Sequence, residues 1–403
     1  MALERSASTV ALRRTAAAAA LTLGAACTAG SPPVSEPGSE PSATSRSTGE
    51  TPGTAPAATV PTATAASPTA RSTATGTPGT TSAPTVTVLL VGDIMLGRAV
   101  GALSRAAGDV AAPLRPLQRR LAAADLTVGN LESTLSMAGP PRQGDDSFAA
   151  DPGVLTGLRD AGFDVLSLAN NHTGDFGLPA LRQTVRRVHE AGIREVGAGR
   201  DLRSAWRPVV LSREGIRFGF LAFNAIGETP RATRRTPGAA SVRMQPRTGP
   251  LSPRDLAATT ARVRRLANRV DVVIVLPHWG DQYTHRPVPD QRRVGRALID
   301  AGASVVVGGH PHWVQDVEMH AGRLLVHSLG NFVFDMDFSL ETREGAMLAL
   351  RFRADQVAEA RLVPYLIDGR FRPRLVCGAA ARSVFAGVRG LRHVTLADEA
   401  MPR

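Results

Sequence analysis

The sequence of 403 residues contains no lysine, only two cysteines and few aromatic residues. All 47 basic residues are therefore arginine, and the net charge is +12. Together with the abundance of alanine, glycine and proline, this indicates the coding bias of a GC-rich genome and is not in itself a nucleic-acid signature. The arginines are spread over expected helix faces, and aromatics at 4% leave few stacking platforms for single strands. We therefore expect no nucleic-acid partner, although a basic surface favours acidic polymers.

The two cysteines, Cys27 and Cys377, exclude a structural zinc site built on thiolates. Free cysteine is commonly buried, so we expect Cys377 to be a small buried apolar residue and not a nucleophile. Cys27 has a different context, because it ends an apparent export signal.

The sequence also lacks an apolar run long enough to predict a membrane span with any weight. The run near the N-terminus covers only residues 16–26 and follows Arg5, Arg13 and Arg14, which is the plan of a secretory signal. Residues 1–27 resemble a bacterial lipoprotein signal in which Cys27 is lipidated, although Gly24 stands where an aliphatic residue is usual. A signal without lipid attachment is the alternative.

Residues 28–84 contain Ser, Thr, Pro, Ala and Gly with almost nothing large. Such a composition cannot bury enough apolar surface to offset its ordering entropy, so it predicts a disordered linker. An anchor, a polar spacer and a globular domain in this order predict an extracytoplasmic protein, held to the outer face of the cell membrane through a lipid.

Five apolar runs of strand length each give way to Gly or Pro and then to Asp, Asn, Glu or His. They are VTVLLVGDIMLGR (86–98), ADLTVGNLES (124–133), FDVLSLANNHTGD (163–175), VDVVIVLPHWGDQY (270–283) and ASVVVGGHPHW (303–313). Helical patterns occur at 153–161, 178–191, 255–269 and 290–301. Strands that alternate with helices predict an α/β fold with a largely parallel sheet, and right-handed crossovers would bring the five polar ends to one edge of it.

Further runs make a purely parallel sheet too simple. RFGFLAFNA (217–225) and RLLVHSLGNFVF (323–334) are expected strands, and a short Ala321-Gly322 turn predicts an antiparallel hairpin with the segment before it. Residues 341–403 predict strands and a helix that complete the domain.

The polar ends supply oxygen and imidazole donors without a thiolate: Asp93, Glu132, Asn171, His172, His278, His310 and His312. This mixture suits one or two divalent ions of Mn, Fe or Zn.

His310 and His312 flank Pro311, which favours an extended backbone before it, so we expect both imidazoles to point to one side. Each donor also has a structural alternative. Asp93 could cap a helix, Asn171 could form a turn, and His278 could be a satisfied core histidine. Their shared position past strand ends favours a common metal site.

The segments GDIMLGR, GNLES, LANNHTGDFG, LPHWGDQY, GGHPHWVQ and HSLGNFVFD, in this order, resemble the motifs of the poly-gamma-glutamate capsule synthesis protein family, CapA. The resemblance covers residues 86–340. It implies the fold of calcineurin-like metallophosphoesterases, a four-layer αββα sandwich in which two mixed sheets pack between helix layers and a metal pair lies at the strand ends.

The resemblance implies a role for each donor near the first strands. Asp93 would bind the first metal, and Glu132 would bridge the two metals with Asn130 beside it. Asn331 would bound the pocket. Met95 stands where these phosphoesterases usually have a metal-binding histidine, which leaves open whether one ion or two are bound.

The later motifs carry the remaining roles. Asn171 would be a metal ligand, and His172 would contact the substrate or protonate a leaving oxygen. His278 and His310 would bind the second metal, and His312 the first. A metal pair would lower the pKa of a bound water and stabilise the attacking and leaving oxygens, with His172 as general acid.

Three hypotheses follow for the whole chain. In the first, an envelope-anchored protein acts in the synthesis, export or trimming of an anionic polymer such as poly-γ-glutamate, with membrane synthase or export proteins as partners. In the second, a tethered metal-dependent hydrolase acts alone on phosphoesters. In the third, which Met95 keeps open, the chain is a non-catalytic scaffold of the same fold.

Overall fold

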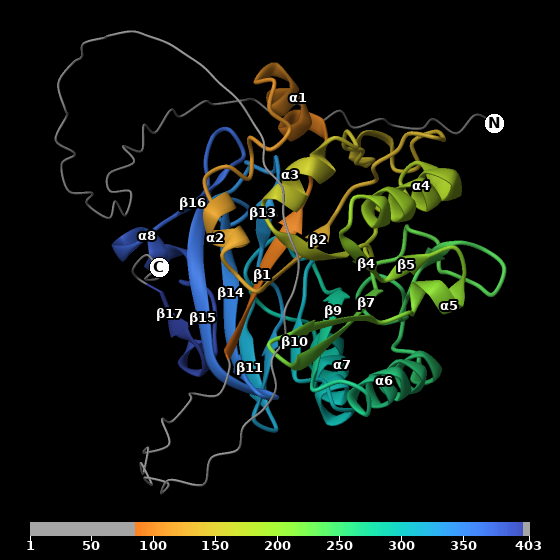
Figure 1. The fold of residues 1–403 in the computed structure, drawn as a ribbon, viewed down its shortest axis with the longest axis vertical. Helices are drawn as coiled ribbons and strands as arrows, with labels where there is room; N and C mark the ends of the chain where they lie inside the picture. The colour runs from red at the N-terminus through yellow and green to blue at the C-terminus, as the bar shows by residue number, and fades with distance from the viewer. Residues whose placement is uncertain (1–84, 398–403) are drawn as a thin grey trace, which may run out of the picture. The chain divides into compact units, whose positions relative to one another are not determined.

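The computed structural model describes residues 85–397, and Figure 1 shows their arrangement as a ribbon. The predicted signal, the linker and the lipidation of Cys27 lie outside the described residues. The strands form a nine-stranded sheet, a six-stranded sheet and a two-stranded sheet. No helix within residues 85–397 is long and apolar enough to cross a bilayer.

The nine-stranded sheet is mixed, since β1 runs parallel to β2 and β13 but antiparallel to β14. Its main order is β16-β15-β14-β1-β2-β3-β4, with β13 paired to β1 and β17 to β15. The bounds are β1 (Thr85–Ile94), β2 (Leu126–Leu131), β3 (Phe163–Ser167), β4 (Arg194–Val196), β13 (Asn331–Val333), β14 (Glu344–Arg353), β15 (Gln356–Ile367), β16 (Pro373–Leu375) and β17 (Thr395–Leu396).

The six-stranded sheet has the order β11-β12-β10-β9-β7-β6 and is also mixed. Its strands are β6 (Val209–Arg213), β7 (Ile216–Asn224), β9 (Val272–His278), β10 (Val305–Val307), β11 (Val317–His320) and β12 (Arg323–Val326). The predicted hairpin at Ala321-Gly322 is confirmed, because β11 and β12 pair antiparallel across it. The small third sheet pairs β5 (Ala198–Gly199) with β8 (Gly238–Ala239).

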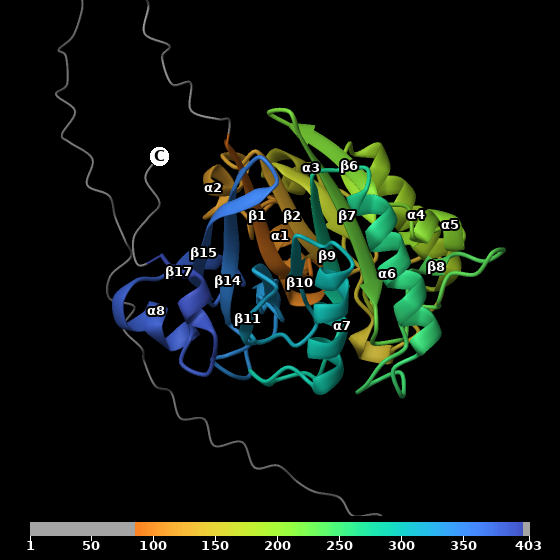
Figure 2. The same cartoon turned by 90° about the horizontal axis from the view of Figure 1, so that it is seen from below.

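The helices form two outer layers. The first layer comprises α1 (Arg98–Ala106), α2 (Gln118–Ala122), α3 (Val154–Asp160) and α4 (Gly177–Glu190), and the second comprises α6 (Pro253–Ala267) and α7 (Pro289–Asp300). In Figure 2, α6 and α7 cover the outer face of β7, β9 and β10. Outside these layers lie α5 (Leu202–Ala205), α8 (Gly378–Val384) and the 3₁₀ turns η1 (Gly144–Asp146) and η2 (Leu391–His393).

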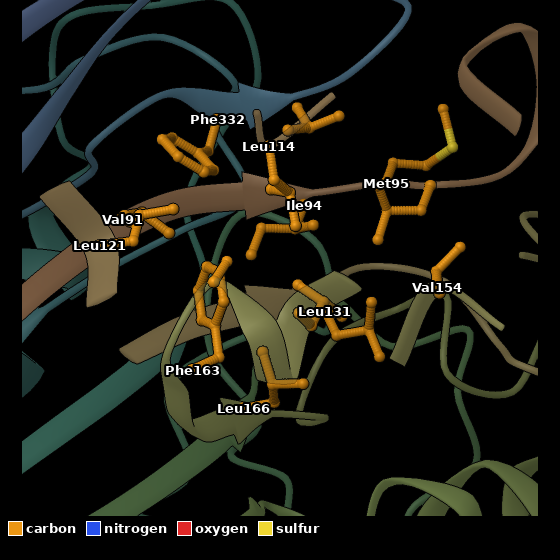
Figure 3. Close-up of a cluster of buried hydrophobic side chains, with 14 of the residues drawn as sticks. Val91, Ile94, Met95, Leu114, Leu121, Leu131, Val154, Phe163, Leu166 and Phe332 are labelled. Carbon is orange, nitrogen blue, oxygen red and sulfur yellow. The ribbon is translucent and has the colours of Figure 1, made fainter. Parts of the chain in front are cut away.

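The alternation of side chains along β1 explains the layers. Val88 and Leu90 face the core between the two sheets, whereas Leu89 and Val91 face the core under the first helix layer. Figure 3 shows part of this second core. Each fully buried Val or Leu contributes about 1.5–3 kcal/mol relative to an exposed one, so a strand that is apolar on both faces is held between two layers. The predicted four-layer αββα sandwich with mixed sheets is confirmed.

Three expectations need correction. The five polar strand ends do not share one sheet, because β1, β2 and β3 belong to the nine-stranded sheet and β9 and β10 to the six-stranded one. The run 323–334 is two strands in different sheets, separated by a turn in which Gly330 has φ +76°. Cys377 is only partly buried and precedes α8.

Candidate metal centre

The polar strand ends of both sheets meet at one site. The carboxylate of Asp93 at the end of β1 and the imidazole of His278 at the end of β9 form one group with Glu132. The ligand atoms of these three residues all lie within 4.8 Å of one another. Glu132 also lies within this distance of His310 and His312, which form a second group with it. All five side chains are buried. The structure therefore brings together residues from four strand ends that are far apart in the sequence.

Glu132 is common to both groups. Its side chain is fully buried, and neither carboxylate oxygen has a hydrogen-bond partner. The nearest imidazole nitrogens to Oε1 are Nε2 of His278 at 3.6 Å and Nε2 of His172 at 3.8 Å, both too long for hydrogen bonds. A buried carboxylate without partners is costly unless it is protonated or coordinates a cation.

His310 has the same character, since both of its ring nitrogens are buried without a partner. Its backbone N–H donates to Oδ2 of Asp93 at 2.9 Å. Unsatisfied imidazole nitrogens facing an unsatisfied carboxylate are the donors that Mn, Fe or Zn would take. The residues present therefore fit a divalent metal.

The backbone at His310 and His312 is not extended as expected. Their φ angles are +96° and +59°, in the left-handed region, which costs of order 1–3 kcal/mol at a residue with a side chain and is typical of functional sites. Both rings still reach the same site, with centroids 5.8 Å apart. Gly309 permits this turn, because a Cβ there would lie 2.5 Å from Oδ1 of Asp93.

Asparagine side chains hold the ligands in place. Asn130 donates to Oδ1 of Asp93 at 2.8 Å and lies 3.3 Å from Nδ1 of His278. Oδ1 of Asn331 lies 2.8 Å from Nδ1 of His312, an arrangement that assigns the proton to Nδ1 and leaves Nε2 free to face the site. Asn331 is fully buried and contacts His312, and its expected place at the edge of the pocket stays a prediction.

Asn171 and His278 lie against each other, with 2.8 Å between Oδ1 and Nε2. These are the atoms with which both side chains would bind a metal, so a bound ion would replace this contact. The resemblance assigned His278 and His310 to one ion and Asp93 with His312 to the other. In the structure, His278 lies close to Asp93 and Glu132, and His310 and His312 lie close to each other and to Glu132, so which ion each residue would bind stays a prediction.

His172 is held in one orientation. Its Nδ1 lies 2.8 Å from Oδ2 of Asp175, and its ring stacks on Phe148 with centroids 3.7 Å apart. Asp175 in turn accepts hydrogen bonds from Gln143 and from the backbone N–H of Phe148, both at 2.6 Å. These contacts turn Nε2 toward Glu132.

Asp175 and Gln143 are two residues of the site that the sequence motifs did not predict. Asp175 stands three residues after His172 in LANNHTGD, and a carboxylate at that spacing was the available signal. Nothing in the sequence places Gln143, since it reaches the site through a loop packed by tertiary contacts.

Burial controls the ionisation of the site. It raises the pKa of Asp93 to about 6 and, with the nearby charge of Asp93, raises the pKa of Glu132 well above its usual range. Burial also lowers the pKa of His312 to about 4 and the pKa values of His278 and His310 well below the usual range. These three histidines are therefore neutral near pH 7, which is the form that binds metals.

Met95 does not belong to the site. Its side chain is fully buried in the core under the first helix layer, where Figure 3 shows it near Leu131 and Val154. Its sulfur accepts a hydrogen bond from the backbone N–H of Gly97 at 3.1 Å. The position at which the resemblance implies a histidine ligand is therefore occupied by a core residue.

The model of one protein family, described as bacterial capsule synthesis protein PGA_cap, matches residues 87–336. The chain belongs to this family. The capsule biosynthesis protein CapA of Bacillus anthracis is 30% identical over 289 residues, which cover 70% of this chain and 68% of that protein. The PGA biosynthesis protein CapA of Bacillus subtilis (strain 168) is 29% identical over 280 residues, 68% of this chain and 70% of that protein.

Among solved structures, a novel phosphatase from Mycoplasma pneumoniae is similar at a TM-score of 0.43 with 11% identity. The match covers 71% of this chain and 95% of the phosphatase. A likeness at this level adds nothing about function to what the site itself shows.

Proposed function

We propose that this chain is a metal-dependent hydrolase of the cell envelope that acts on an anionic capsule-type polymer, such as poly-γ-glutamate, during its synthesis, export or trimming. The observation that carries the proposal is Glu132, a buried carboxylate without hydrogen bonds that is shared by two groups of metal-competent side chains. Membership of the capsule synthesis family supports the polymer as the substrate class.

Divalent metals bound at this site would supply Lewis-acid stabilisation of the attacking and leaving oxygens. Asp93, Glu132, His278, His310 and His312 would hold them, with Asn171 as a further oxygen ligand.

His172 would hold the proton that the leaving group takes. Nδ1 of His172 lies 2.8 Å from Oδ2 of Asp175, which leaves Nε2, the nitrogen that faces Glu132, as the atom that would pass a proton to the leaving oxygen. Phe148 stacks on one face of this ring, and the guanidinium of Arg98 lies 4.5 Å from the centroid of Phe148. Arg98 is in turn paired with Asp335. The ring of His172, the proposed general acid, is therefore held in place by Phe148 and Arg98.

The test combines metal analysis with hydrolysis by the full-length chain. Elemental mass spectrometry should find bound Mn, Fe or Zn, and the purified protein should shorten poly-γ-glutamate. The variant His310→Ala/His312→Ala should lose both properties. The control His320→Ala/His393→Ala, which removes two histidines outside the site, should keep both. Absence of metal after supplementation with each ion would overturn the proposal in favour of the scaffold.

The location is proposed from the sequence alone. We infer export with lipidation at Cys27, so Cys27→Ser should release the protein from the membrane fraction and reduce surface polymer. An unchanged distribution of protein and polymer would contradict the anchor without affecting the metal centre.

A further inference from the structure

Ten arginines line two neighbouring clefts away from the metal centre. The first arginine cleft has a volume of about 760 Å³ and lies between α5 and α6, where it is lined by Arg203, Arg234, Arg262, Arg265 and Arg269. Its one carboxylate is Asp201. That carboxylate accepts from the backbone N–H of Ser204 at 2.7 Å and lies 3.6 Å from Arg200, so it is already engaged.

The second arginine cleft has a volume of about 510 Å³ and lies between α4 and the β5–β6 segment. It is lined by Arg182, Arg186, Arg194, Arg200 and Arg207. Its one carboxylate, Glu195, lies 3.3 Å from His189. Pro208 lines both clefts, so the two meet there. In Figure 1, the short helix α5 lies between α4 and α6 at this place.

Most arginines of the first cleft lack a counter-charge. Within residues 85–397, no carboxylate lies within 4.0 Å of the guanidinium of Arg203, Arg234, Arg265 or Arg269. The arginines of this range that do form ion pairs with carboxylates are Arg98, Arg115, Arg159, Arg186, Arg200, Arg213, Arg217, Arg231, Arg247, Arg286, Arg292, Arg296, Arg351, Arg361, Arg372 and Arg374. Like charges gathered without partners repel one another, and a bound anion removes that repulsion.

Trp206 is a buried side chain that lines the first cleft. The guanidinium of Arg262 lies 4.6 Å from the centroid of the Trp206 ring, a cation–π contact that holds one arginine head in place. Burial and the neighbouring charge of Arg265 lower the pKa of Arg262. A guanidinium that is positioned in advance loses less entropy when it binds a carboxylate through two parallel hydrogen bonds.

We propose that the two arginine clefts form a binding track for an extended polycarboxylate, separate from the metal centre. An extended chain fits two consecutive concave clefts, whereas an anionic membrane would meet a flat basic face. Single-stranded nucleic acid would need exposed rings, but the aromatic residue that lines these clefts, Trp206, is 8% exposed and covered by Arg262. The choice of a polycarboxylate over other polyanions rests on the proposed function. The assignment of the clefts as an anion-binding site rests on their arginines alone.

No residue that lines the clefts belongs to the metal centre. The track would hold the polymer on the surface while another part of the same polymer reaches the metal centre. Such a second contact raises the effective concentration of the polymer at the metals without any new chemistry.

The test is a titration of fluorescently labelled poly-γ-glutamate with the full-length chain, followed by anisotropy. In the variant Arg203→Gln/Arg265→Gln/Arg269→Gln, the dissociation constant should rise at least about tenfold. The control Arg293→Gln/Arg353→Gln/Arg370→Gln removes the same charge from exposed arginines outside the clefts and should change the constant less than about twofold. Equal losses in the two variants, or no loss in either, would overturn the proposal, because binding would then follow net charge or another surface.

Two further measurements separate this proposal from the proposed function. In the background of His310→Ala/His312→Ala, which should not hydrolyse the polymer, the triple arginine change should still raise the dissociation constant at least about tenfold, because the clefts lie outside the metal centre. If the wild type binds through the clefts but shows no metal and no hydrolysis, only the proposed function fails. RNA or vesicles of phosphatidylglycerol that bind as tightly as the polycarboxylate, with the same loss in the cleft variant, would overturn the proposed partner.

Discussion

The candidate metal centre and the arginine clefts place their charged side chains in opposite surroundings. The candidate metal centre buries Asp93, Glu132 and three histidines, and asparagine side chains hold Asp93 and His312 in place. The clefts expose most of their arginines and give one of them, Arg262, an aromatic support.

This difference predicts how each region responds to mutation. Preorganised buried ligands act as a unit, so the loss of one should disable the whole metal centre. Exposed arginines contribute small and nearly independent amounts, so only combined changes should affect the clefts.

The largest effect is expected for Glu132→Gln, which removes the charge that both ligand groups share. Metal content should fall at both positions, and hydrolysis should drop by more than about 100-fold, beyond the range typical of outer-shell residues. Elemental analysis and polymer-length assays measure the two results. The exposed Glu190→Gln should change neither, and an unchanged metal content in Glu132→Gln would show that Glu132 is not a ligand.

A smaller effect is expected for Asp175→Asn, which removes the carboxylate that orients His172 without touching the metal ligands. Turnover should fall about 10–100-fold while metal content stays at the wild-type level. Asp281→Asn, an exposed change, serves as control; equal turnover in both variants would exclude His172 as the acid.

Asn331→Ala tests the support behind a single ligand. Without the amide oxygen, the His312 ring loses its fixed tautomer, so the affinity for metal should fall about tenfold. Competition with a chelator of known affinity measures this. An affinity equal to that of the wild type, in a folded variant, would mean that the fold alone positions His312.

The smallest effect, a change in folding stability, is expected at Glu318, which pairs with two arginines. Glu318 lies 2.9 Å from Arg292 and is also paired with Arg296, and it contacts His327. Hydrogen bonding from His327, followed by the two arginines, lowers the pKa of Glu318 to about 2 from its ordinary value of 4.5. Because the folded-state pKa is depressed, the stabilisation is complete above pH 4.5 and is lost as the pH falls through about 2.

Glu318→Gln should therefore lower the free energy of unfolding by about 1–2 kcal/mol near pH 7, since the partly exposed pairs are screened by solvent. Denaturant titrations at several pH values should show the difference between variant and wild type shrinking toward pH 2. The triple arginine variant of the first cleft should change stability by less than about 0.5 kcal/mol at any pH. A larger loss would mean that those arginines support the fold.

Much of the metal centre was predictable because its information is local. An apolar strand followed by a turn and a polar residue is visible in the sequence, and such ends meet at the edge of a layered α/β fold. The helices at 153–161, 178–191, 255–269 and 290–301 are confirmed within two residues, because their apolar spacing and their boundary residues are also local.

The tertiary structure decided the rest. It placed the five strand ends in two sheets, gave His310 and His312 a left-handed backbone, and buried Asn331 behind His312. The spacing of neighbouring residues predicts none of these three features, because each feature depends on which layers pack together.

The arginines show the same limit most clearly. In the sequence, those of residues 182–187 and 262–265 lie on separate helices and are typical of solvated faces. The fold brings α4 and α6 to either side of α5, so that charges about 80 residues apart face two adjoining clefts. The sequence by itself determined the strands, the helices and the candidate metal donors, since these follow from neighbouring residues. Only the tertiary structure decided which distant side chains lie together at one site, because that depends on how the layers pack.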